Sequence, residues 1–96
     1  MARRQYIVTY DISDDKRRTS VFKTLLGHGD HVQFSVFLCA LNPMEHAKLR
    51  ALLSETIHAR EDQVILVDLG LAPDDPAPLL DCLGKRYNPT ARVQVI

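Results

Sequence analysis

The sequence predicts an α+β fold in which two helices pack on one face of a mainly antiparallel sheet. Three observations lead to this expectation. Stretches rich in β-branched and aromatic residues alternate along the chain with two stretches whose apolar residues recur at helical spacing. Each helical stretch begins with a polar cluster that can cap a helix. The 96 residues are enough for one hydrophobic core and too few for two, so we expect residues 1–96 to form a single domain.

The first strand is expected at residues 5–12, which read QYIVTYDI. A helix over residues 14–26 should follow, with Ser13 as its N-cap and acidic residues near the positive end of the helix dipole. Its apolar residues at helical spacing are Val21, Phe22, Leu25 and Leu26. Gly27 and Gly29 then predict the end of this helix.

Two further stretches have the composition of strands. Residues 31–41, HVQFSVFLCAL, form either one long bent strand or two short strands with a tight reversal near residues 33–35. The sequence leaves both alternatives open. Residues 62–69, DQVILVDL, are expected to form another strand, which Gly70 and a loop with three prolines close.

The second helix has a strong start signal. Asn42 is the expected cap, Pro43 lies in the first turn, and Glu45 occupies the capping-box position. One face of this helix, which runs to about residue 58, carries Leu49, Leu52, Leu53 and Ile57.

The C-terminal part is expected to add a short strand at residues 79–84 and a terminal strand at residues 92–96. The order of elements is then β-α-β-β-α-β with an additional C-terminal strand. This order is typical of a ferredoxin-like domain, with two helices on one face of the sheet.

Both faces of the central strands are largely apolar, although an antiparallel sheet with helices on one side usually turns a polar face to water. In the strand expected at residues 62–69, Ile65, Val67 and Leu69 point to one side, and Val64 and Leu66 point to the other. We therefore expect a homodimer, in which a second copy of the chain covers the open face around a two-fold axis. Residues 79–96 are expected to contribute to this dimer, because a terminal strand can add to the sheet edge of a partner.

The distribution of charge narrows the function classes. The formal net charge is zero, which argues against a protein that coats nucleic acid by bulk electrostatics. Residues 1–23, however, hold six basic and three acidic side chains, whereas residues 42–82 hold three basic and eight acidic ones. A nucleic acid would therefore meet the N-terminal half of the chain.

The N-terminal apolar run is short and interrupted by polar residues, so it makes neither a signal peptide nor a membrane span. We therefore expect a cytoplasmic protein without a membrane partner. Cys39 and Cys82 are too few for a zinc knuckle or a disulfide framework, and both lie in apolar stretches. We expect both cysteines to be reduced core residues.

Asp11 is the leading candidate for chemistry, because it ends the first strand on the same face as Ile7 and Thr9. The alternative is a turn residue that accepts hydrogen bonds from local amides. Mg²⁺ keeps several waters and needs only one or two protein carboxylates, so two copies of Asp11 related by a two-fold axis could hold Mg²⁺, or Mn²⁺. The ion could then polarise a phosphodiester and activate a water for hydrolysis.

Basic and aromatic residues near the end of the first strand are candidate contacts for nucleic acid. Lys16, Arg17 and Arg18 lie on the first turns of the first helix, and arginine suits bidentate contact with phosphate. The alternative for these three is a solvated helix face. Tyr10 and Phe37 could stack on bases, with packing in the core as the alternative.

Three motifs together resemble those of the CRISPR-associated protein 2 family. They are YDI at residues 10–12, SDDKRR at residues 13–18, and VQFSVF at residues 32–37, which follows Gly29. The resemblance continues through the second helix and the VDLG segment, so it covers most of the chain. One departure is Leu38, because many relatives carry Glu at this place.

The resemblance implies a ferredoxin-like homodimer that joins an integrase, CRISPR-associated protein 1, to capture DNA and insert it as new spacers into a CRISPR array. Members of the family are also described as metal-dependent endonucleases that act on single-stranded RNA or on DNA. By this pattern Asp11 matches the metal-binding aspartate. The resemblance places Tyr10, Arg17, Arg18 and Phe37 around an active cleft, and Ser35 matches its motif. We therefore expect catalysis from Asp11, Tyr10 and Phe37, and contact with nucleic acid from Lys16, Arg17, Arg18 and Ser35.

Two other functions fit the same architecture. One is a stand-alone endoribonuclease of the toxin type, similar to virulence-associated protein D. The other is a ferredoxin-like binding dimer without catalysis. The sequence does not decide between RNA and DNA as the substrate.

Overall fold

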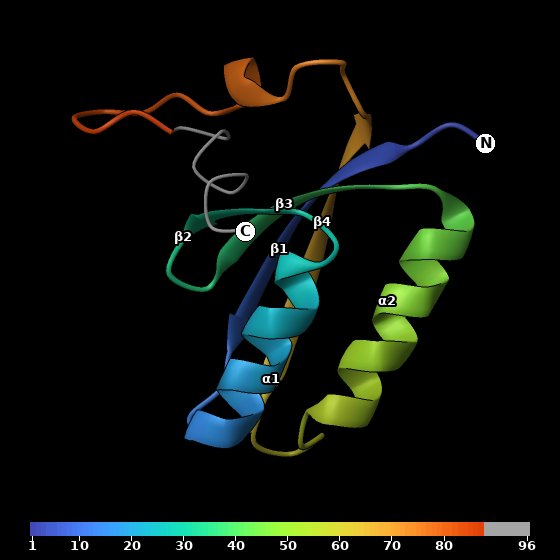
Figure 1. Ribbon diagram of the computed structural model, residues 1–96, viewed down its shortest axis with the longest axis vertical. Coiled ribbons are helices and arrows are strands. Elements are labelled where there is room, and N and C mark those ends of the chain that lie inside the picture. The colour runs from blue at the N-terminus through green and yellow to red at the C-terminus, as the bar shows by residue number, and fades with distance from the viewer. Residues whose placement is uncertain (88–96) are drawn as a thin grey trace.

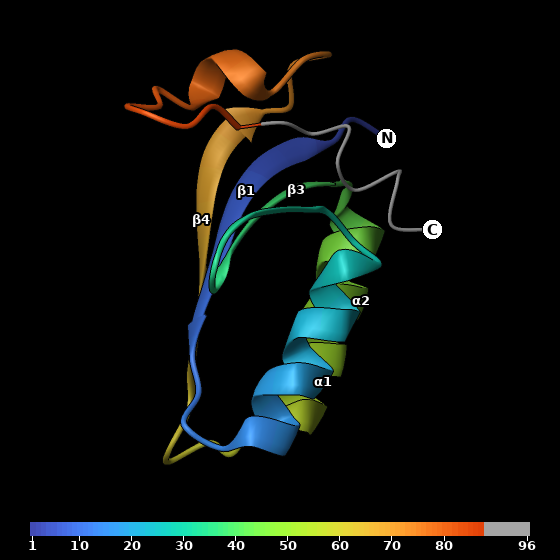
Figure 2. The same cartoon turned by 60° about the vertical axis from the view of Figure 1, so that its left-hand side comes forward.

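The computed structural model describes residues 1–87, which form a sheet with helices on one face (Figure 1). The elements are β1 (Arg4–Asp11), α1 (Asp15–Leu26), β2 (Asp30–Gln33), β3 (Val36–Leu41), α2 (Pro43–Thr56), β4 (Gln63–Leu71) and a 3-10 helix, η1 (Ala77–Leu79). Within these residues the four strands pair antiparallel in the order β2-β3-β1-β4. Figure 2 shows α1 and α2 together on one side of this sheet. The predicted α+β, ferredoxin-like fold is confirmed.

The core lies between the sheet and the two helices. Alternate residues of β1 point into it, and Tyr6, Val8 and Tyr10 are all buried there. They meet Val21 and Leu25 of α1, and Leu49 and Leu53 of α2. Because β1 is paired on both sides and covered by both helices, the residues at its carboxyl end are held in fixed positions.

The helix starts follow from local capping, and one prediction needs correction. At α2 the Asn42 side chain accepts a hydrogen bond from the Glu45 amide at 2.8 Å, and the Glu45 carboxylate accepts one from the Asn42 amide at 2.8 Å, which confirms the capping box. At α1 the N-cap is Asp14, whose carboxylate accepts from the Arg17 amide at 2.9 Å, so the prediction of Ser13 was wrong. Ser13 and Asp14 both have a side-chain oxygen that can accept a hydrogen bond. The path of the chain after β1 decides which of the two faces the free amides of the first turn of α1.

The extended stretch at residues 31–41 is two strands, with a reversal at Phe34 and Ser35 between β2 and β3. The Tyr10 amide donates to the Ser35 carbonyl at 3.2 Å, which ties this reversal to the end of β1. The structure therefore brings the first and third motifs of the sequence together.

The segment after residue 69 differs from the prediction. β4 continues through Gly70 to Leu71, because a bulge opposite β1 accommodates Gly70 at a φ of 99°, a conformation that glycine adopts without strain. The expected strand at residues 79–84 was wrong, since only η1 and irregular chain follow through residue 87. Pro73, Pro76 and Pro78 directly precede this segment, and prolines remove strand donors and favour turns.

The remaining predictions have separate outcomes. Cys39 is buried as expected, but Cys82 is exposed because its segment is not a strand of the sheet. The expected strand at residues 92–96 lies outside the described residues. Within residues 1–87, neither helix is long and apolar enough to cross a bilayer.

Candidate nucleic-acid and metal site

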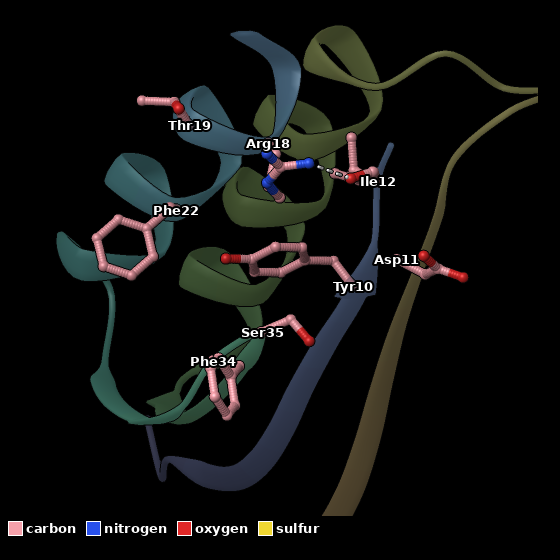
Figure 3. Close-up of a pocket in the computed structure, with 8 residues that line it drawn as sticks. All are labelled: Tyr10, Asp11, Ile12, Arg18, Thr19, Phe22, Phe34 and Ser35. Atoms are coloured by element: carbon pink, nitrogen blue, oxygen red, sulfur yellow. Dashed lines mark hydrogen bonds between the residues drawn. The ribbon is translucent and has the colours of Figure 1, made fainter. Parts of the chain in front are cut away.

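The carboxyl end of β1, the middle of α1 and the reversal between β2 and β3 line an open cavity of about 470 Å³ (Figure 3). The residues that line it are Tyr10, Asp11, Ile12, Arg18, Thr19, Phe22, Phe34 and Ser35. Four of the residues that the sequence assigned to a site, Tyr10, Asp11, Arg18 and Ser35, are therefore neighbours. Lys16, Arg17 and Phe37 do not line this cavity.

Asp11 is exposed at the edge of the cavity. Its carboxylate points away from the Tyr10 ring, toward the other side of the strand (Figure 3). Tyr10 and Asp11 point to opposite sides because successive side chains alternate along a strand. Asp11 therefore lies on the face of Ile7 and Thr9, as expected. The carboxylate therefore lies at the boundary between the cavity and the face of the sheet that no helix covers.

Tyr10 points to the helix side of the sheet, where its ring stacks on Phe37 with 6.4 Å between ring centroids. Burial raises the pKa of the Tyr10 hydroxyl, and the nearby Arg18 opposes this in part. At neutral pH the hydroxyl therefore keeps its proton. It can therefore donate a hydrogen bond to a ligand in the cavity.

Phe37 has no exposed surface and lies in the core. Its ring contacts Phe22 at 5.5 Å and His31 at 4.9 Å between centroids, in addition to Tyr10. Phe37 therefore supports the aromatic wall of the cavity from behind, and any contribution to a site is made through the rings that it packs against.

Arg18 is the cation of the cavity wall. Its guanidinium donates to the carbonyl oxygens of Ile12 at 3.0 Å and Ser13 at 3.2 Å, and it pairs with Asp15. These contacts fix the group beside the cavity while the side chain stays 45% exposed. An exposed and oriented guanidinium is suited to a phosphate oxygen.

Arg17 points elsewhere, although it is the neighbour of Arg18 in the sequence. Its Nε donates to Asp62 at 2.7 Å and its Nη2 donates to Glu61 at 3.1 Å. Asp62 accepts hydrogen bonds from Arg17 and, at 2.8 Å, from the His58 amide. Both lower the pKa of the Asp62 carboxyl, the bond from Arg17 most. Lys16 is exposed on the outer side of α1.

Two aromatic residues of the site, Phe22 and Phe34, were not among the predicted site residues. Phe22 was interpreted as core because of its helical spacing, and it is half-buried between the core and the cavity. Phe34 is the third residue of the VQFSVF motif, and its ring is exposed. The helical and strand periodicities report which residues face the core, so they give no signal for a ring at a turn.

The fit of a metal ion depends on Asp11. Within residues 1–87 no group of three or more His, Cys, Asp or Glu side chains is placed to hold a metal. Asp11 is the one carboxylate among the residues that line the cavity. It supplies one hard oxygen ligand, which suits an ion such as Mg²⁺ that retains most of its water shell.

The face of the sheet away from the helices carries exposed apolar side chains. Ile65, Val67 and Leu69 of β4 are 45%, 43% and 44% exposed. Val67 pairs in register with Ile7 of β1, whose side chain is half-buried. We call Ile7, Ile65, Val67 and Leu69 the open-face patch. Val64 and Leu66 pack against the core, so the expected apolar character of both sides of this strand is confirmed. The expectation that it is a central strand was wrong, because β4 lies at an edge of the sheet in the order β2-β3-β1-β4.

Comparison with known proteins identifies the family. A sequence model described as CRISPR associated protein Cas2 matches residues 4–73. The chain belongs to this family. The matched residues run from β1 to just beyond β4, so they include every site residue of the Cas2 pattern that the sequence predicted.

Curated relatives cover nearly the whole chain. The CRISPR-associated endoribonuclease Cas2 of Geobacter sulfurreducens is 38% identical over 91 residues, which are 95% of each chain. The CRISPR-associated endoribonuclease Cas2 1 of Rhodospirillum rubrum is 38% identical over 95 residues, which are 99% of this chain and 92% of that protein.

Solved structures show the same fold. A hypothetical protein, TT1823, from Thermus thermophilus superposes with a TM-score of 0.76 and 30% identity, over 91% of this chain and 98% of that one. Streptococcus pyogenes Cas2, crystallised at pH 6.5, superposes with a TM-score of 0.70 and 27% identity, over 83% of this chain and 99% of that one.

Proposed function

We propose that this chain acts as a homodimer that binds nucleic acid and hydrolyses its phosphodiester bonds at Asp11 with Mg²⁺ or Mn²⁺. The observation that carries the proposal is the position of Asp11. It is exposed on the same face of β1 as Ile7, which belongs to the open-face patch. The endoribonuclease names of the Geobacter and Rhodospirillum relatives support the reaction class.

The dimer follows from the open-face patch. Four apolar side chains on one sheet face would be stabilised by contact with a like surface, and a two-fold axis is the usual way to pair two identical faces. In such a dimer the Asp11 side chains of the two copies would be the protein ligands of the ion. When bound, Mg²⁺ supplies Lewis-acid polarisation of the phosphodiester and a water that ionises more readily.

Residues of the cavity would bind and orient the substrate. Arg18 offers its exposed guanidinium to a phosphate oxygen, and the Tyr10 and Ser35 hydroxyls can donate to sugar or phosphate oxygens. The described residues that line the cavity include no serine or cysteine beside a histidine base, and attack by water is the mechanism that these residues support.

The decisive experiment replaces Asp11. Asp11→Ala should abolish cleavage of RNA or DNA in the presence of Mg²⁺, while circular dichroism and the sedimentation coefficient stay those of the wild type. Asp74→Ala, which removes an exposed loop carboxylate, is the matched control and should cleave normally. Cleavage by Asp11→Ala at the wild-type rate would exclude the assignment.

We further propose that the dimer serves as a DNA-binding scaffold for the CRISPR-associated integrase in spacer acquisition. Membership of the Cas2 family supports this, together with the excess of basic side chains in residues 1–23. Reconstituted spacer integration with the integrase tests it, using wild type and Asp11→Ala. Integration that persists in Asp11→Ala would show that the scaffold works without hydrolysis, and integration that never requires this chain would exclude the scaffold.

The same cleavage and integration experiments distinguish the two other functions that the sequence left open. A binding dimer without catalysis would bind nucleic acid but leave it intact with either Mg²⁺ or Mn²⁺. A stand-alone endoribonuclease would cleave RNA alone and have no effect on integration.

A further inference from the structure

Phe34 combines two unfavourable features at one position. Its backbone has a φ of 33°, and it is the one non-glycine residue with positive φ among residues 1–87. Its ring is 88% exposed, so it contributes almost nothing to the core. A turn of this kind is usually occupied by Gly or Asn, which adopt the left-handed region more readily. Folding stability therefore does not explain an aromatic residue here.

The reversal that carries Phe34 is fixed on both sides. The Phe34 carbonyl lies 2.7 Å from Nε2 of His31, and the His31 ring packs against Phe22 and Phe37. The next carbonyl, of Ser35, accepts from the Tyr10 amide. The backbone that presents the ring is therefore held in place, and the ring stands at the cavity edge (Figure 3). Backbone strain that the surroundings maintain in this way is typical of functional positions.

Phe34 belongs to the walls of two cavities. The first is the cavity of about 470 Å³ that contains Arg18. The second, of about 890 Å³, lies between β2 and the chain at residues 79–87, and its wall includes Gln33, Lys85 and Arg86. The exposed ring therefore lies between two cavities that each contain a basic group.

The basic groups of the second cavity are available to a ligand. Among residues 1–87, neither Lys85 nor Arg86 forms an ion pair. Among the described residues that line this cavity, Asp81 is the only carboxylate, compared with the two basic side chains of Lys85 and Arg86. An exposed aromatic ring between two cavities that each contain a basic group is an arrangement with which proteins bind single strands, because bases stack on the ring and phosphates meet the basic groups.

We propose that Phe34 is a stacking platform for an unpaired base, and that a single strand of nucleic acid runs over it from the Arg18 cavity to the cavity of Lys85 and Arg86. This inference rests on the proposed function, that the chain binds nucleic acid, and adds the residue that contacts a base and the path of the strand. A fully paired duplex keeps its base faces stacked within the helix, so it has no face to offer Phe34.

The chain contains no tryptophan, so Phe34→Trp places a single fluorophore at the platform. Titration with an unlabelled single-stranded oligonucleotide, without divalent metal so that no strand is cut, should quench this fluorescence, and a blunt duplex should not. Met44→Trp places the same fluorophore at another exposed position, at the start of α2 and outside both cavities, and should not be quenched. Anisotropy of a labelled strand, measured in parallel, reports binding independently of stacking.

Phe34→Gly is the second variant, and it keeps the test valid if tryptophan disturbs the turn. Glycine removes the ring and adopts the left-handed conformation without strain, so the protein should fold at least as well as the wild type. Its affinity for a single strand should fall about tenfold, with the affinity for a blunt duplex unchanged. Replacing both Lys85 and Arg86 by Ala should reduce the salt dependence of single-strand binding.

The outcomes separate the platform from the proposed function. Single-strand binding by anisotropy without quenching of Phe34→Trp, together with wild-type affinity in Phe34→Gly, would overturn the platform and leave nucleic-acid binding intact. If no strand of RNA or DNA binds the wild type, the proposed function fails, and the platform fails with it.

Discussion

Arg17 on α1 donates to both carboxylate oxygens of Asp62, from Nε at 2.7 Å and from Nη2 at 3.3 Å. The two residues are 45 positions apart in the sequence. The Asp62 side chain has no exposed surface, and Arg17 is 26% exposed. The pair therefore joins the start of α1 to the loop before β4, which are the two segments that flank the exposed Asp11 end of β1.

The pair predicts that Arg17 and its neighbour Arg18 have different roles. Arg17→Ala should lower the melting temperature by several degrees, because it leaves the Asp62 carboxylate buried without its main partner. Arg18→Ala should leave the melting temperature nearly unchanged, and should weaken nucleic-acid binding and reduce its salt slope by about one. Thermal denaturation and salt-dependent anisotropy of both variants measure this difference.

The two variants are controls for each other, since each removes one arginine from the same helical turn. Folded Arg17→Ala, measured below its transition temperature, should bind nucleic acid with nearly wild-type affinity. Equal losses of affinity in both variants would mean that Arg17 also contacts the nucleic acid, and would contradict the different roles of the two arginines.

The same pair predicts a dependence of stability on acid. The hydrogen bonds from Arg17 and from the His58 amide hold the pKa of Asp62 below its ordinary value of 3.8. A carboxyl whose pKa is lowered in the folded state stabilises the fold above its unfolded pKa, and this contribution is lost as pH falls through the folded value. Asp62→Asn should therefore destabilise the protein at neutral pH, and the difference from the wild type should shrink below about pH 4.

Melting curves of wild type and Asp62→Asn, measured from neutral pH to below about pH 4, test whether the difference in stability shrinks toward acid. Asp74→Asn changes an exposed loop carboxylate and should follow the wild-type curve at every pH. A difference in melting temperature between wild type and Asp62→Asn that widens toward acid would contradict the predicted effect of the Asp62 pKa on stability.

Gly29 is predicted to be required by packing. A Cβ atom at this position would lie 2.4 Å from Sγ of Cys39 and 2.5 Å from the Leu38 carbonyl oxygen, because the loop after α1 passes directly over β3. Gly29→Ala should therefore cost about 3 kcal/mol in the free energy of unfolding, as overpacked positions do. Urea denaturation at a fixed protein concentration measures this loss.

Gly27→Ala is the matched control. Gly27 has ordinary helical angles, and a Cβ atom there would meet only the Thr24 carbonyl at 3.4 Å. This variant should be as stable as the wild type or slightly more stable, since alanine restricts the unfolded chain. A loss in Gly27→Ala equal to that in Gly29→Ala would mean that flexibility of the loop, and not close packing, requires these glycines.

The sequence predicted the features that depend on neighbours along the chain. The capping box of Asn42 and Glu45 and the face of Asp11 follow from local spacing, and both are observed. The cap of α1 and the reversal at Phe34 were missed or left open, because each depends on how the end of β1 meets another segment. The partner of Arg17 could not be predicted at all, since no local pattern reports a contact across 45 residues.

The open-face patch predicts the effect of a charge on association. Val67 is 43% exposed in the single chain and pairs in register with Ile7 at the centre of the patch. Val67→Asp should therefore leave the isolated fold intact, shift the sedimentation coefficient to that of a monomer and abolish cleavage, because an unpaired charge in an apolar interface is costly. Met44→Asp puts the same charge at an exposed position of α2 and should remain a dimer. A dimeric Val67→Asp would place the interface elsewhere.

A mixing experiment tests whether the two Asp11 carboxylates form one site. Wild type and Asp11→Ala are unfolded together and refolded at equal amounts, so that subunits pair at random. If the site needs both carboxylates, only wild-type homodimers cleave, and activity should be about one quarter of that of wild type at the same total concentration. If each chain carries a complete site, activity should be about one half, because every wild-type chain then acts alone. The position of Asp11 on the same sheet face as the open-face patch favours the first value, since a two-fold axis through that patch would bring the two carboxylates toward each other.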